Sequence, residues 1–270
     1  MRERAGGASP AISPATTIGN ENGAETRRRV AVVGISVNRY CGVRDHARLL
    51  TEELERRGAA CSVIWLTREA RGLRASRAEV RAWSRQLEQH LEREQPDAVV
   101  LHYSVFSYCY RGFPMFLRPV LAAIARTGLP IVTFGHELAY PWHHAGLRGK
   151  LWAIAQRPAV LELVRASTAI IVTADFRSDW LNGRWWLPRR PVRVAPVFST
   201  LPAPRRQAGA SIERDVVGLF GYAYGGVAVE AVLDALRLLT DRGVAVRLRL
   251  LGAPGADSPS AAQWLSLIHI

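Results

Sequence analysis

The chain has 270 residues, of which 49% are hydrophobic, enough to bury the core of one large domain or two ordinary ones. No apolar run approaches the length of about 18 residues that a membrane-spanning helix requires, and residues 1–26 lack the apolar core of a signal peptide. The formal net charge of +13 comes almost wholly from arginines spread along helical faces, so we expect no nucleic-acid partner. The cysteines are few and lack ligand-like spacing, which indicates a reducing compartment and a cytoplasmic protein.

The first segment with a clear pattern runs from residue 28 to residue 66. Val30–Ile35 is a short, β-branched, apolar run typical of a parallel strand that is buried on both faces. A polar loop around Asn38–Gly42 follows, and then an amphipathic helix that Gly58 ends. Cys61–Leu66 starts a second strand. The segment is therefore predicted to open an α/β sheet, in which ligands bind at the carboxyl ends of the strands.

Strands and helices continue to alternate along the chain, which predicts a parallel, doubly wound sheet. The further predicted strands are 98–102, 131–134, 169–173 and 192–195, and the helices between them are 76–94, 114–126 and 147–165.

Composition divides the chain into domains. Residues 1–26 are rich in small residues and proline, and we expect them to be a disordered tail. An amino-terminal Rossmann-like domain is predicted over 27–195, followed by a Pro- and Arg-rich linker over 196–212. A second Rossmann-like domain with a parallel sheet is predicted to begin at 213 and to be cut off at 264, because residues 265–270 have the character of a non-native tail.

Three motifs occur in an order that resembles one enzyme family. A Cys-Gly-Val-Arg-Asp segment (41–45) follows the first strand, a Tyr-rich segment follows the third, and a His-Glu pair (136–137) follows the fourth. This order, over about residues 28–252, resembles the group-1 glycosyltransferases of the GT-B fold, which have two Rossmann-like domains and retain the anomeric configuration. The resemblance implies a nucleotide diphosphate sugar as donor, a glycan or lipid-linked acceptor on the amino-terminal side, and no separate cofactor.

Polar residues follow four of the predicted strands, and the carboxyl ends of parallel strands lie along one edge of a sheet. We expect these residues to converge on one crevice whose hydrogen-bonding groups suit a sugar. His136 and Glu137 are the candidate catalytic pair, because the resemblance implies that a histidine at this strand end contacts the donor sugar. A histidine whose hydrogen bonds are satisfied at the strand end is the alternative. The candidate substrate-binding residues are Gly42, Val43, Arg44, Asp45, Tyr103, Ser104 and Asp175.

The loop after the first strand is expected to bind part of the ligand. Gly42 is expected to let the backbone approach a ligand, and the amino end of the following helix suits a phosphate, with Arg44 adding charge. A plain turn is the alternative. The rings that follow the third strand, beginning with Tyr103, either stack on a sugar or pack against helices, and the sequence leaves both open.

The candidate donor-binding residues are Gly221, Tyr222 and Gly225 in the second domain. The resembling family usually places an arginine and then a lysine on the donor diphosphate in this loop, whereas Tyr222 and Gly225 stand at the nearest positions here. The paired-glutamate segment that grips the donor in this family is also missing from the sequence. We therefore expect a carboxyl-terminally truncated chain that is inactive alone. A non-catalytic sugar- or partner-binding relative is the alternative function.

Two other classes of enzyme fit the sequence less well. A nicotinamide-dependent oxidoreductase is disfavoured because the first loop lacks GxGxxG and no acidic residue ends the second strand. A metal-dependent enzyme is disfavoured because no Asp-x-Asp motif occurs and no carboxylate lies at convincing ligand spacing, so we expect no metal. His143 and His144 are predicted to be surface residues.

A Trp- and Arg-rich segment, residues 177–193, suggests a peripheral membrane contact. Trp180, Trp185 and Trp186 lie among arginines, and tryptophan prefers the bilayer interface while arginine attracts anionic lipids. Such a contact would place the protein at the inner face of the plasma membrane. Packing of the tryptophans inside the domain is the alternative, and the sequence favours neither.

Overall fold

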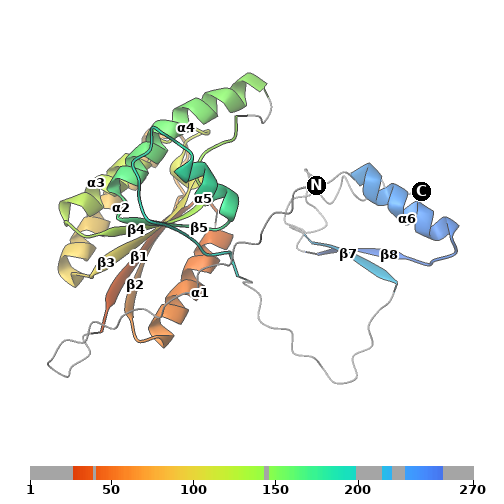
Figure 1. Cartoon of the computed structure of the whole chain (residues 1–270), viewed down its shortest axis with the longest axis horizontal. Coiled ribbons are helices and arrows are strands. Elements are labelled where there is room, and N and C mark those ends of the chain that lie inside the picture. The colour runs from red at the N-terminus through yellow and green to blue at the C-terminus, as the bar shows by residue number, and fades with distance from the viewer. Residues whose placement is uncertain (1–26, 39–40, 143–145, 199–214, 221–228, 252–270) are drawn as a thin grey trace, which may run out of the picture. The chain divides into compact units, whose positions relative to one another are not determined.

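The computed structural model describes residues 27–38, 41–142, 146–198, 215–220 and 229–251 (Figure 1). The chain divides into two compact units, Met1–Pro202 and Ala203–Ile270. The predicted tails at 1–26 and 265–270 lie outside the described residues, as does most of the predicted linker.

Unit 1 contains a six-stranded parallel sheet with the strand order β2-β1-β3-β4-β5-β6. Each strand overlaps a predicted one, because short apolar runs between helices read clearly as buried parallel strands. The strands are β1 (Arg29–Ser36), β2 (Ala60–Thr67), β3 (Ala98–Ser104), β4 (Ile131–Glu137), β5 (Ala169–Val172) and β6 (Val192–Val194). The helices are α1 (Gly42–Arg56), α2 (Leu73–Glu94), α3 (Leu117–Arg126), α4 (Gly146–Ala166) and α5 (Asp175–Asn182), with a short 3-10 helix η1 (Val105–Tyr108) after β3.

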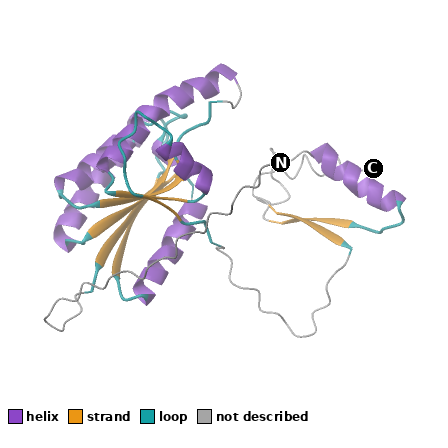
Figure 2. Ribbon diagram, viewed as in Figure 1, coloured by secondary structure: helices purple, strands orange, loops and turns teal. Residues whose placement is uncertain are grey.

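The sheet has helices on both faces (Figures 1 and 2). Helices α2, α3 and α4 lie side by side over one face, and α1 lies on the other. The hydrophobic core fills the layer between the sheet and α2–α4, where Val33 of β1, Leu101 and Tyr103 of β3 and Leu87 of α2 are fully buried.

Strand alternation decides which residues face α1. Successive side chains of a strand point to opposite faces of the sheet. Because Leu101 and Tyr103 face the main core, His102 and Ser104 lie on the α1 face of β3. The face covered by α1 therefore carries polar residues at the carboxyl edge of the sheet.

Unit 2 has a strand, a helix and a strand in the described residues. Strands β7 (Val216–Phe220) and β8 (Arg247–Leu251) pair in parallel, and α6 (Val229–Asp241) connects them. Parallel strands connected by a helix form the βαβ unit of which Rossmann-like domains are built. The candidate donor-binding residues Gly221, Tyr222 and Gly225 lie outside the described residues. None of the described helices is long and apolar enough to cross a membrane.

Candidate functional site

The strand order reverses direction at β1, which has β2 on one side and β3 on the other. In open α/β sheets, ligands bind outside the carboxyl ends of the strands at such a reversal, because the connections leave the sheet on opposite faces there. The predicted polar residues stand at this edge, at the ends of β1, β3 and β4.

Helix α1 begins within the segment predicted to be a loop. Cys41 has extended backbone angles and precedes the helix, whose first residue is Gly42. Asp45 lies in the first turn, where a carboxylate complements the partly positive helix end. The first turn of α1, rather than a loop, therefore follows the reversal point.

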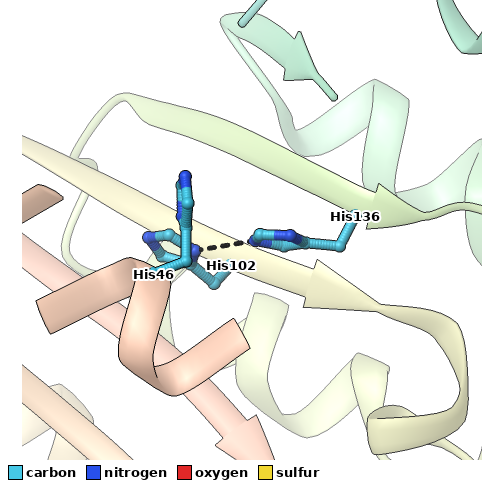
Figure 3. A group of neighbouring side chains, drawn as sticks. All are labelled: His46, His102 and His136. Carbon is cyan, nitrogen blue, oxygen red and sulfur yellow. Dashed lines mark hydrogen bonds between the residues drawn. The ribbon is translucent and has the colours of Figure 1, made fainter. Parts of the chain in front are cut away.

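Three histidines cluster beneath this edge (Figure 3). His46 comes from α1, His102 from β3 and His136 from β4, and all three are buried. The Nδ1 atom of His102 lies 3.1 Å from Nε2 of His136, within hydrogen-bonding distance. The ring of His46 stands edge-on to that of His136, with their centroids 5.1 Å apart.

Aromatic rings hold this cluster. The ring of His102 stacks on Phe134, its register partner in β4, with 5.3 Å between centroids and 7° between planes. The ring of Phe198 stacks on His46 at 4.6 Å. Phe198 falls within the predicted linker, and its contact joins that stretch of chain to unit 1.

A register shift occurs at His136, near the end of β4. Tyr103 pairs with Gly135, but the next residue, Ser104, pairs with Glu137, so His136 is an extra residue in β4. Bulges of this kind re-aim side chains next to functional sites. Beyond the bulge, the Ser104 hydroxyl donates a hydrogen bond of 2.9 Å to Oε2 of Glu137.

An open cavity of about 590 Å³ lies against these residues. One wall holds Ser104, His136 and Glu137, and the other holds Arg177 from α5, whose Nη1 donates to the Thr173 hydroxyl at 2.9 Å. A cavity of this volume accommodates a small ligand. Its lining residues are Val43, Ser104, His136, Glu137, Thr173, Arg177, Pro196 and Val197.

Burial sets the charge of the histidines. It lowers the pKa of His102 to about 3, with smaller contributions from His136 and His46. It lowers the pKa of His136 to about 4, and His46 and Arg177 add to that effect. Both imidazoles are therefore neutral at pH 7, and each carries one donor and one acceptor nitrogen. The cavity thus offers neutral hydrogen-bonding groups, one carboxylate and one guanidinium.

The structure brings four of the sequence-predicted site residues to the cavity: Val43, Ser104, His136 and Glu137. Gly42, Arg44 and Asp45 are exposed at the start of α1, and Arg44 turns toward the end of β2, where its Nη1 donates to Thr67 at 3.2 Å.

Two other predicted residues do not reach the cavity. Tyr103 is fully buried and packs on Tyr108 in the main core, because strand alternation points it away from the α1 face. The Tyr-rich segment therefore contributes core packing at this position. Asp175 is exposed at the start of α5, and the cavity takes Arg177 from that helix instead. His143 and His144 lie outside the described residues.

Sequence reasoning missed His46, Thr173 and Arg177. His46 sits one turn into the helix that follows β1, at the same sheet edge as His102 and His136, and that placement was the available signal. The orientation of Arg177 depends on how α5 packs, and no spacing in the sequence reveals it.

Three neutral imidazoles are also a donor set that zinc accepts. One ring nitrogen from each histidine lies within 4.8 Å of the other two. The 3.1 Å contact between His102 and His136 is short enough for a shared proton, which a metal ion would have to displace. His102 and His136 as they stand form a hydrogen-bonded pair, with His46 packed against it.

No family model matches the sequence, and no curated protein matches it. An alpha-glucosyltransferase in complex with UDP and a 13-mer DNA containing a HMU base matches with a TM-score of 0.50 and 9% identity, over 89% of this chain and 70% of that chain. A structure of alpha-glucosyltransferase (AGT) in complex with UDP matches with a TM-score of 0.51 and 9% identity, over 88% of this chain and 70% of that chain.

This chain shares the fold of these two alpha-glucosyltransferase structures. The six-stranded parallel sheet and the likeness to these structures confirm the α/β fold class that was predicted from the sequence. At 9% identity the likeness establishes the fold, and the activity must be argued from the chemistry of the site.

Proposed function

We propose that the protein is a glycosyltransferase that moves a hexose from a nucleotide diphosphate sugar to a glycan or lipid-linked acceptor. The observation that carries this proposal is the cavity at the carboxyl edge of the sheet, where His136 and Glu137 face Arg177. Solved structures that share the fold contain UDP, which supports a nucleotide sugar as the donor.

Three cavity residues have a direct role in this proposal. The neutral imidazole of His136 binds a hydroxyl group of the sugar. Glu137 is exposed, accepts a hydrogen bond from Ser104 and binds a hydroxyl group of the acceptor. Arg177 supplies positive charge toward the departing diphosphate, which is the role that a metal ion has in other transferases. Transfer accordingly needs no divalent metal and no cofactor, and it retains the anomeric configuration, as in the resembling family.

The acceptor is the less constrained part of the proposal. A lipid-linked acceptor would place the protein in the cytoplasm at the inner face of the plasma membrane. Structural neighbours that were solved with DNA make DNA the competing acceptor. Because the chain is expected to be inactive alone, binding of membrane lipid extracts, of glycans and of duplex DNA containing a HMU base separates these classes. Binding of the DNA alone would contradict the proposed acceptor.

Donor binding is tested by saturation-transfer difference NMR on this chain. UDP-glucose, free glucose, UDP and NADH are compared at equal concentration. The proposal predicts saturation of the hexose protons of UDP-glucose and none of NADH. Saturation of NADH alone would contradict a transferase and favour an oxidoreductase.

A non-catalytic sugar-binding relative is the second candidate. Tyr222 and Gly225 favour it, because they stand where the resembling family usually places basic residues on the donor diphosphate. Saturation of free glucose as strong as that of UDP-glucose would select this alternative, because a transferase needs the nucleotide diphosphate as its leaving group.

A further inference from the structure

The hydrogen bond between His102 and His136 determines which nitrogen of each ring carries the proton. It joins Nδ1 of His102 to Nε2 of His136 at 3.1 Å, and the side chains belong to adjacent strands (Figure 3). A neutral imidazole carries its one proton on either Nδ1 or Nε2, and a ring nitrogen that accepts a hydrogen bond cannot carry that proton. Each ring's tautomer therefore dictates the other's.

Two arrangements satisfy this bond, and the surroundings of His102 distinguish them. Its second nitrogen, Nε2, is buried and has no hydrogen-bond partner among the described residues. If His136 were the donor, His102 would carry its proton on Nε2, as a buried N–H without a partner. If His102 is the donor, that Nε2 is an unprotonated acceptor. Unpaired buried N–H groups are rarer than under-satisfied acceptors, so the second arrangement is favoured.

The ring of His102 is held from several sides. It stacks on Phe134 and lies 6.1 Å from the ring of Trp65. The Tyr108 hydroxyl donates a hydrogen bond of 2.9 Å to the main-chain carbonyl of His102. His102 is only 1% exposed, so water does not compete for its Nδ1. These contacts make His102 a rigid donor, on which the more exposed His136 depends.

We propose that His102 is a positioning residue that donates its Nδ1 proton to Nε2 of His136 and so holds His136 as the Nδ1–H tautomer. His136 lines the cavity, and its Nδ1 has no hydrogen-bond partner among the described residues. The side chain therefore presents an N–H donor to the ligand. It binds an oxygen atom of the sugar, and it does not act as a general base through Nε2.

The low pKa values of both rings agree with this assignment. A protonated His136 would carry hydrogens on both nitrogens and would lose its acceptor for the His102 proton. Burial, the ring of His46 and the guanidinium of Arg177 all oppose that protonation. The single-proton form of each ring is thus the one present at neutral pH.

The tautomer is measured directly by ¹⁵N NMR of the imidazole nitrogens in histidine-labelled protein. In wild type, Nδ1 of His136 is expected to be protonated and Nε2 unprotonated. His102→Asn places an amide nitrogen at the level of Nδ1 and should preserve the tautomer. His102→Leu removes the donor and should release His136 to a mixture of both forms. His90→Ala, in α2 outside the cavity, supplies the assignment control.

The wild-type spectrum alone can overturn the proposal, even if a variant fails to fold. A proton on Nε2 of His136 would overturn it. An unchanged tautomer in a folded His102→Leu variant would do the same. Uptake of one equivalent of Zn²⁺ with loss of the bridging proton would also contradict it, because these nitrogens would then be metal ligands.

The identity of the ligand rests on the proposed function, and a separate readout tests it. Binding of UDP-glucose should weaken several-fold in His102→Leu and recover in His102→Asn. A confirmed tautomer with unchanged binding in both variants would count against the proposed function while the positioning role stands.

Discussion

Ser104 on β3 donates a hydrogen bond of 2.9 Å to the carboxylate of Glu137 on β4, across the bulge that contains His136. The bond joins the two strands beyond the bulge and fixes one oxygen of Glu137. The positions of Glu137 and His136 are therefore linked through the backbone that they share.

Substitution of Ser104 by alanine should lower the free energy of unfolding by about 1 kcal/mol, the usual contribution of one hydrogen bond. Binding of UDP-glucose should weaken several-fold, because Glu137 and His136 lose their fixed positions. Urea denaturation and ligand titration measure the two effects. Ser62→Ala, in the outer strand β2 and outside the cavity lining, is the matched control. Equal binding by both variants would contradict the role given to Ser104.

Two glycines near the site make opposite predictions. A Cβ atom on Gly34 would lie 2.2 Å from the ring of Trp65, whereas a Cβ on Gly42 would meet nothing within 4 Å. Gly34→Ala should therefore destabilise the protein by roughly 1–3 kcal/mol through overpacking. Gly42→Ala should change the stability by less than about 0.5 kcal/mol. Comparable losses in both variants, measured by urea denaturation, would contradict the packing described around Trp65.

The histidine cluster predicts that stability falls in mild acid. Burial lowers the folded-state pKa of His46, His102 and His136 below the usual value of 6.5. Between pH 6.5 and about pH 4, these histidines bind protons in the unfolded chain that they do not bind in the folded protein. The free energy of unfolding should therefore drop as the pH falls through this range, by roughly 1 kcal/mol per pH unit for each of His102 and His136.

Urea denaturation at pH 7 and at pH 5 measures this loss. His102→Leu removes one of the titrating groups, and its stability should change less between the two pH values than that of wild type. His90→Ala should behave like wild type. A variant His102→Leu that lost as much stability as wild type would contradict the low pKa of His102.

The tryptophans proposed for membrane contact differ in exposure. Trp185 is 92% exposed, whereas Trp180 and Trp186 pack edge to face against each other and against the core. If the protein docks on anionic membranes, Trp185→Ala should reduce its sedimentation with anionic vesicles, while Trp142→Ala serves as an exposed control. Equal, negligible binding to anionic and neutral vesicles at low salt would end the membrane hypothesis.

Much of the site was predictable because strand ends in a parallel sheet share one edge. Short apolar runs located β1, β3 and β4, and the residues directly after them included Ser104, His136 and Glu137. The same alternation rule separates His102 from Tyr103, since neighbours in a strand face opposite sides. Applied to β3, it would have assigned Tyr103 to the core.

Other features depend on packing that a single sequence does not encode locally. The extra residue in β4 has no signature in the His-Glu pair itself. The contact of Phe198 with His46 joins segments far apart in the chain, and Arg177 reaches the cavity through the placement of α5. These relationships arise from tertiary contacts, which pattern and propensity do not specify.

The central claim is that the cavity beside His136 binds the hexose of a nucleotide sugar. Saturation-transfer NMR with UDP-glucose tests it most directly when wild type is compared with His136→Ala and His90→Ala. The account predicts that saturation of the hexose ring protons falls at least several-fold in His136→Ala and is unchanged in His90→Ala. Equal saturation in all three proteins would contradict it.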